Sequence, residues 1–215
     1  MSSGENRTRI VLVRHGETLW NIEGRIQGYH SDSPLTENGH AQAKAVGERL
    51  AREGIDALYS SDLGRTRQTA EHIARATGLT LRPEPGVRER GYGVFEGFTF
   101  EEIGVEFPEA YAKFRSRDPH FAAEKGESAV QFRDRVMAAL ADIASRHVGQ
   151  RTVVVTHGGV VGSMYRVATD TPLDAPRIAP ARNASLNHLL FNAGRWTLEV
   201  WGDIAHLDEE SLDDE

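Results

Sequence analysis

The chain contains no cysteine among its 215 residues. That absence excludes disulfide bonds, thiolate-ligated metals and a cysteine nucleophile. Positive charge is also in deficit, because 25 Lys and Arg residues stand against 32 Asp and Glu residues and the formal net charge is −7. This balance argues against a nucleic acid or an anionic membrane as the partner. A cluster of arginines in such a chain therefore indicates a local binding site.

Long apolar runs are missing as well. None approaches the roughly 20 residues that a helix needs to cross a bilayer, and the opening stretch, MSSGENRTR, lacks the apolar centre of a signal peptide. We therefore expect no membrane partner, and a cytoplasmic location follows as the default expectation. The length predicts one domain with a substantial core of its own.

Short apolar strands alternate with amphipathic helices along the chain, which predicts an α/β protein. Ser128 and Gln131 predict a capping box at the start of the longest helix, and Ala41, Ala45 and Leu50 have the spacing of a core-facing stripe on an earlier one. The strands are expected at 10–13, 56–59, 79–81, 152–155, 186–191 and 196–201, and the helices at 36–52, 63–76, 128–147 and 158–167.

The run TVVV at 152–155 is typical of a strand buried on both faces, as in parallel sheets. The whole pattern predicts a single three-layer αβα domain with a mostly parallel central sheet over residues 9–207. A flexible N-terminus is expected at 1–8 and an acidic C-terminal tail at 208–215.

Charged side chains follow four separate stretches of this predicted sheet. Arg14 and His15 come directly after the first strand, Arg65 after the second, Glu89 beyond the third, and His157 after TVVV. Ligands of α/β sheets bind at the carboxyl ends of the strands, where these residues should meet.

The residue types suit one chemistry. Two guanidinium groups bind an oxyanion such as phosphate or a carboxylate, and the arginine beside His15 favours its neutral, nucleophilic form. A protonated His157 would donate to an oxygen as charge develops, and Glu89 fits a proton carrier to a leaving group. The set predicts phosphoryl transfer through a phosphohistidine without a metal ion.

The chain has nine histidines, and the alternative hypothesis is that some of them bind a metal ion. None of them is paired at the i, i+4 spacing of a zinc-binding helix, and no carboxylate-rich loop frames them. The arginine beside His15 would also repel a cation. We therefore predict no metal.

The motifs LVRHGET, SSDLGRTRQTAEHIA and VVVTHGG, together with Glu89 before GYGVFEG, resemble the histidine phosphatase superfamily, also called the phosphoglycerate-mutase-like family. The resemblance runs from residue 10 to about residue 207, and it is strongest to bacterial proteins labelled phosphoglycerate mutase 2. An R-H-G triplet alone would be a weak signal, but four blocks in order across a domain are specific.

The resemblance implies a role for each matching residue. His15 matches the nucleophile that becomes phosphorylated, and Glu89 matches the acid that protonates the leaving oxygen and then activates water, with Glu96 as its nearest competitor. The expected phosphate and substrate contacts are Arg14, Asn21, Arg65, His157, Gln27, Gly28 and Tyr92, and a contact from Arg25 stays open.

The choice between phosphatase and mutase depends on the segment ERGYGVFEGFTF. Cofactor-dependent mutases have a histidine at the position of Gly91 and a lysine at the position of Phe100, and an aromatic ring cannot pair with a carboxylate as that lysine does. Arg115 and Arg117 only loosely match the adjacent arginines of the mutases. We therefore predict a phosphatase of small phosphomonoesters that needs no cofactor.

Two alternatives stay open. The first is a phosphoglycerate mutase, which would use 2,3-bisphosphoglycerate, and the second is a non-catalytic anion-binding module. The aromatic-rich stretch 98–125 fits either a lid over the substrate or simple packing. The sequence decides neither the substrate nor whether the chain forms a homodimer.

Overall fold

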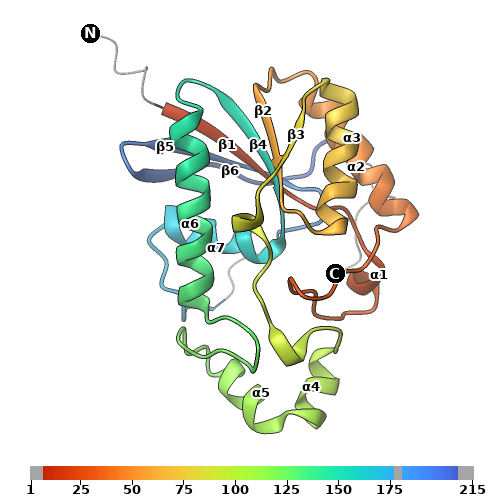
Figure 1. Cartoon of the computed structure of the whole chain (residues 1–215), viewed down its shortest axis with the longest axis vertical. Helices are drawn as coiled ribbons and strands as arrows, with labels where there is room; N and C mark the ends of the chain where they lie inside the picture. The colour runs from red at the N-terminus through yellow and green to blue at the C-terminus, as the bar shows by residue number, and fades with distance from the viewer. Residues whose placement is uncertain (1–6, 177–180, 208–215) are drawn as a thin grey trace.

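The computed structural model describes residues 7–176 and 181–207. It contains one six-stranded sheet in the order β3-β2-β4-β1-β5-β6 (Figure 1). Strands β1, β2, β3 and β4 pair in parallel, whereas β5 is antiparallel to both β1 and β6. The strands are β1 (Arg7–Arg14), β2 (Ala57–Ser60), β3 (Leu81–Pro83), β4 (Arg151–Thr156), β5 (Leu186–Asn192) and β6 (Arg195–Asp203).

The helices begin at residues that satisfy their free amide groups. Ser128 and Gln131 form the expected capping box, and the Thr36 hydroxyl accepts from the amide of Gly39. The helices are α1 (Leu19–Ile22), α2 (Glu37–Leu50), α3 (Gly64–Thr77), α4 (Phe100–Glu106), α5 (Pro108–Arg115), α6 (Ala129–Arg146) and α7 (Gly158–Ala168), with 3-10 turns at Pro85–Val87 and Gly93–Phe95. Within the described residues, no helix is both long and apolar enough to span a membrane.

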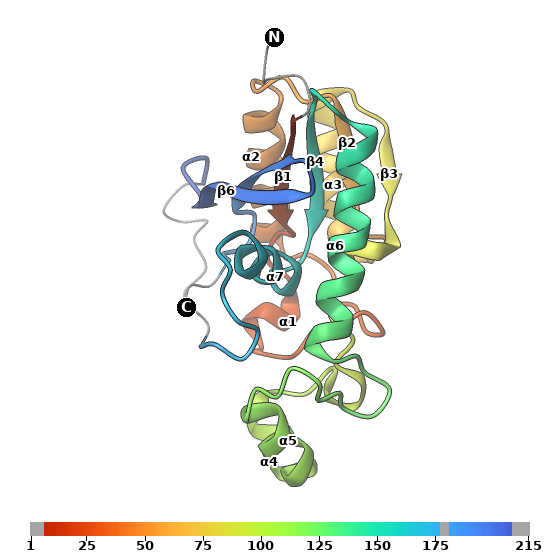
Figure 2. The same ribbon diagram turned by 90° about the vertical axis from the view of Figure 1, so that its left-hand side faces the viewer.

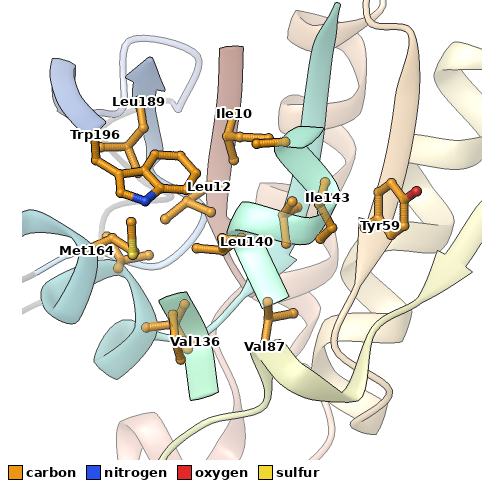
Figure 3. Close-up of a cluster of buried hydrophobic side chains, with 14 of the residues drawn as sticks. Ile10, Leu12, Tyr59, Val87, Val136, Leu140, Ile143, Met164, Leu189 and Trp196 are labelled. Atoms are coloured by element: carbon orange, nitrogen blue, oxygen red, sulfur yellow. The ribbon is translucent and has the colours of Figure 1, made fainter. Parts of the chain in front are cut away.

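Alternation along the central strands builds a core on each face of the sheet. Ile10 and Leu12 of β1 pack with α6 and α7, as Figure 3 shows, whereas Val11 and Val13 pack with α2 and α3 on the opposite face. The helices thus lie in two layers around the sheet (Figure 2). The predicted three-layer α/β fold with a mostly parallel sheet is confirmed.

Three local expectations differ from the structure. Ala41 is exposed and Ala45 is only half-buried. The buried stripe of α2 runs instead through Ala43, Val46 and Leu50. The inward orientation predicted for Ala41 is therefore wrong, since Ala41 lies about 200° around the helix from Ala43. Strand β3 starts at residue 81, not 79, and its edge position tolerates Pro83.

The first strand also begins earlier than expected. It includes Arg7 and Thr8, and the buried Thr8 hydroxyl donates to the carbonyl of Ala144 at 2.7 Å. Residues 1–6 and the predicted acidic tail at 208–215 lie outside the described residues.

The aromatic-rich stretch forms α4 and α5, which lie beyond the carboxyl ends of the parallel strands, away from the rest of the domain (Figure 1). They enclose a small separate core around Phe95 and Ile103, against which Phe107 and Phe114 pack. We refer to residues 98–125 as the lid segment. The packing expected of this segment is present, because Phe98 and Phe107 belong to this core, and Phe100, Phe114 and Phe121 line a cleft. A role as a lid over the substrate stays a prediction.

Candidate active site

A cleft of about 850 Å³ opens at the carboxyl ends of the parallel strands, between the domain and the lid segment. The ends of β1, the start of α3, the loop after Pro85–Val87 and the start of α7 all contribute to it. Of the predicted site residues, it brings together Arg14, His15, Asn21, Gln27, Arg65, Glu89 and Tyr92. The other two predicted residues do not line the cleft. The His157 ring packs against that of His15, and the Gly28 carbonyl oxygen accepts a hydrogen bond from Arg65.

His15 is 3% exposed and its Nδ1 lies 2.8 Å from the carbonyl oxygen of Gly16. Burial lowers the pKa of His15 well below its usual value, and the charges of Arg65 and Arg14 lower it further. The imidazole is therefore neutral, with its proton on Nδ1. Nε2 keeps a lone pair that can attack an electrophile.

The two arginines are fixed by different partners. Arg65 is fully buried, and it donates to Oδ1 of Asp32 at 2.8 Å and to the carbonyl of Gly28 at 3.0 Å. Arg14 donates to the carbonyl of Ala181 at 2.5 Å. Gly28 thus orients Arg65 and does not line the cleft. Asp32 offsets the cost of burying a charge, since an unpaired buried cation is strongly unfavourable.

His157 is fully buried, and its ring lies edge-on to that of His15 with centroids 5.5 Å apart. Burial, followed by the charge of Arg65, holds the pKa of His157 well below its usual value. The lowered pKa favours the neutral form of His157 in the free protein, whereas the sequence-based scheme considered its protonated form as the donor. Its Nε2 lies 2.9 Å from the Ser61 hydroxyl, and its buried Nδ1 has no hydrogen-bond partner within the described residues.

Glu89 is 7% exposed and accepts from two backbone amides, that of Arg90 at 2.7 Å and that of Gly159 at 2.9 Å. Burial nevertheless raises the pKa of Glu89, because desolvation outweighs these hydrogen bonds and the nearby arginines. Gly159 leaves room for the carboxylate in this position, since a Cβ on it would lie 2.1 Å from the Glu89 carboxylate and would displace it.

The competing carboxylate, Glu96, is placed differently. It accepts from the backbone amides of His30, Ser31 and Tyr92, and it does not line the cleft. Glu96 therefore holds the loop around residues 28–31 against the segment after Glu89.

The remaining predicted contacts present polar groups along the cleft. Asn21 uses its Oδ1 to accept from the Thr18 hydroxyl and the Asn183 amide, at 2.9 and 3.2 Å, which leaves its Nδ2 as a donor. The buried Oε1 of Gln27 has no hydrogen-bond partner in the part of the chain that the structure describes. Tyr92 lies beside Arg90, whose guanidinium carbon is 5.5 Å from its ring centre.

Sequence reasoning missed the residues that orient the reacting groups: Asp32, Ser61, Gly159 and Asn183. Ser61 and Gly159 stand within the quoted motifs. Asn183 opens the stretch NASLNHLLF and Asp32 lies within RIQGYHSDSPLT, two further stretches that resemble the family, so position in a motif was a usable signal for all four residues. Five further arginines line the cleft: Arg25, Arg90, Arg115, Arg117 and Arg166.

Among the described residues, no group of three or more His, Asp or Glu side chains is arranged to hold a metal ion. The fold and the site together define an α/β protein with an arginine-lined cleft at the carboxyl ends of its strands. The particular family follows from comparison with known proteins. The chain belongs to the histidine phosphatase superfamily (branch 1), whose family model matches residues 10–204, and the predicted resemblance is confirmed.

The names of the relatives refer to both mutases and phosphatases. The chain is 43% identical to Phosphoglycerate mutase-like protein 4 of Arabidopsis thaliana, over 93% of this chain and 87% of the plant protein. It is 39% identical to Probable phosphoglycerate mutase GpmB of Photorhabdus laumondii, over 96% and 98%. A mycobacterial glucosyl-3-phosphoglycerate phosphatase superposes with a TM-score of 0.81 at 31% identity, covering 91% of this chain and 99% of that one, and has also been solved with VO3. The family implies a phosphate-ester substrate.

Proposed function

We propose that this protein hydrolyses small phosphomonoesters through a phosphohistidine intermediate on His15. The observation that carries the proposal is the neutral imidazole of His15, whose Nδ1 is engaged by Gly16 while Nε2 stays nucleophilic beside Arg14 and Arg65. An imidazole held this way is an activated nucleophile, and two guanidinium groups beside it suit a phosphoryl group.

In the first step, Nε2 of His15 forms a bond to phosphorus as the bond from phosphorus to the alcohol oxygen breaks. Glu89 gives its proton to that departing oxygen, which its raised pKa favours. In the second step, water attacks phosphorus and passes a proton to the Glu89 carboxylate. The bond between nitrogen and phosphorus breaks, and phosphate leaves with His15 and Glu89 restored.

The phosphoryl oxygens are held by Arg14 and Arg65, with Asn21 and His157 as additional donors. His157 is assigned as a neutral donor in this scheme, although it is buried behind His15 and does not line the cleft of the free protein. If the Ser61 hydroxyl donates to Nε2, the imidazole proton resides on Nδ1, the atom without a partner among the described residues. Fixed donors of this kind stabilise the charge that develops in the transition state without reorganising.

A phosphoglycerate mutase is the second candidate, and one observation favours it. Arg115 and Arg117 line the cleft, so charge that could bind the carboxylate of a phosphoglycerate is present. Phe100 favours the phosphatase, because its half-exposed ring lies against Phe114 at the position where mutases have a lysine. The names of the relatives are compatible with both activities.

The test follows phosphate release from p-nitrophenyl phosphate and 3-phosphoglycerate with EDTA present, and 2-phosphoglycerate formation with and without 2,3-bisphosphoglycerate. Phosphate release without isomerisation supports the phosphatase, and the insensitivity to EDTA supports a reaction without metal. Rapid isomerisation that depends on the bisphosphate would establish the mutase instead.

The histidine variant His15→Ala completes the test. We expect it to abolish phosphate release, and we expect the wild-type protein, but not the variant, to carry an acid-labile phosphoryl group after a rapid quench. A wild-type protein that binds phosphate esters without becoming phosphorylated would be the anion-binding module.

A further inference from the structure

A buried hydroxyl group without a partner lies in the wall of the cleft. Ser163 of α7 lines the cleft and is 7% exposed, and its Oγ has no hydrogen-bond partner among the described residues. A serine or threonine inside a helix normally donates to the carbonyl four residues earlier. Thr169, at the end of the same helix, does so to Tyr165 at 2.8 Å. Ser163 therefore lines the cleft with a hydroxyl group that is buried and has unused donor and acceptor capacity.

Ser163 lies one helical turn beyond the contact that holds the acid. It follows Gly159 by four residues, so both lie on one face of α7, about 6 Å apart along the helix axis. The Gly159 amide donates to Glu89 at 2.9 Å. Helical side chains lean toward the N-terminus of their helix, which inclines Ser163 toward Glu89.

The alcohol half of a substrate must lie on this side of the cleft. Under the proposed function, on which this inference rests, Glu89 protonates the ester oxygen, so the carbons attached to that oxygen lie next to Glu89. Ser163 is then within reach of the first substituents of the leaving group.

We propose that Ser163 is a specificity-determining residue that hydrogen-bonds a hydroxyl group on the carbon next to the esterified carbon. A neutral hydroxyl fits better than an anionic group, because Glu89 becomes negatively charged once it has given up its proton and would repel an anion beside it. A substrate lacking the hydroxyl leaves the buried Oγ unpaired, which discriminates against that substrate.

The test compares 2-hydroxyethyl phosphate with ethyl phosphate, which differ only by that hydroxyl. We expect the wild-type protein to favour the hydroxylated ester about tenfold in kcat/KM, and Ser163→Ala to bring the ratio close to one. The matched control is Ser145→Ala, because Ser145 is exposed on α6 and donates to the Asp142 carbonyl, away from the cleft. It should keep the wild-type ratio.

Thermal unfolding of each variant checks its fold. A Ser163→Ala protein that keeps the wild-type ratio, or that loses both esters equally, would overturn the assignment while leaving the phosphatase intact. A wild-type protein that releases no phosphate from either ester or from p-nitrophenyl phosphate would refute the proposed function, and this inference with it.

Discussion

Burial moves the pKa values of His15 and Glu89 in opposite directions, lowering that of His15 and raising that of Glu89. Each shift favours the uncharged form, and in the proposed mechanism each uncharged form is the reactive one: a neutral imidazole attacks and a protonated carboxyl group donates. Under that proposal, the same desolvation prepares both the nucleophile and the acid.

The acid role of Glu89 predicts a dependence on the leaving group. Glu89→Gln should slow an alkyl phosphate by about 10²–10⁴-fold, because its alkoxide needs a proton to depart. p-Nitrophenyl phosphate should slow far less, since its phenolate leaves unaided. Steady-state kcat/KM for the two substrates measures this, and equal slowing of both would contradict the acid role.

The shifted pKa values also predict the pH profile. For an alkyl phosphate, kcat/KM should rise as the pH passes the lowered pKa of His15, because the imidazole then loses its proton. It should fall as the pH passes the raised pKa of Glu89, because the carboxyl group then loses its proton. The maximum should therefore lie between the lowered pKa of His15 and the raised pKa of Glu89, where His15 is neutral and Glu89 is protonated. With p-nitrophenyl phosphate the fall at higher pH should be much weaker, and an identical profile for both substrates would argue against this assignment.

At the scale of elements, the start of α7 determines where the acid sits. Gly159 and Gly162 lie on the same helix, but an added Cβ would lie 2.1 Å from the Glu89 carboxylate at Gly159 and meets nothing within 4 Å at Gly162. Both substitutions exchange glycine for alanine in one helix, with the larger propensity gain expected at the more interior Gly162, so a difference in kinetics between the two reports the contact with Glu89.

Gly159→Ala should therefore displace Glu89 and lower kcat/KM for an alkyl phosphate about 10²-fold, with a smaller loss for p-nitrophenyl phosphate. Gly162→Ala should raise the melting temperature by about 2–4 °C, which is what roughly 1 kcal/mol gives in a domain of this size. Calorimetry and kinetics on both variants provide the check, and two variants with the same kinetics would show that the contact is unimportant.

At the scale of the whole molecule, charge is unevenly distributed. The chain has a net charge of −7, yet its cleft gathers arginines from the sheet end, the lid segment and α7. Arg117, which follows α5, donates to the carbonyl of Ala175 at 3.0 Å, so the lid segment is connected to the loop after α7 beside the cleft. The anionic protein thus offers its anionic substrates a local positive field.

This distribution predicts that Arg117→Gln raises KM for 3-phosphoglycerate by about 5- to 10-fold, because that substrate carries a carboxylate in addition to its phosphate. KM for p-nitrophenyl phosphate should change less than about twofold on the same argument. Arg133→Gln is the control, since Arg133 pairs with the neighbouring Asp134 and does not line the cleft. An equal rise in KM for both substrates would indicate a general disturbance of the lid segment.

Several parts of the fold could be predicted because their signals are local. The apolar runs of β1 and β4, the caps of α2 and α6, and the RHG and HGG motifs are all readable from neighbours in the chain. Helices α4 and α5 were not predicted, because their aromatic residues pack against one another across turns and onto Ile26, a contact distant in sequence. The exposed Ala41 shows the same limit, because small apolar residues on two faces of a helix leave its buried face ambiguous.

The sequence by itself determined the α/β class, the family and the set of residues at the strand ends, since these depend on periodicity and on motifs that are contiguous in the chain. Only the tertiary structure decided that His157 lies neutral behind His15, that Gly28 and Asp32 orient Arg65, and that Ser163 is left without a partner beside the acid. Protonation and hydrogen bonding depend on burial and on groups brought from far along the chain, and neither exists until the chain has folded.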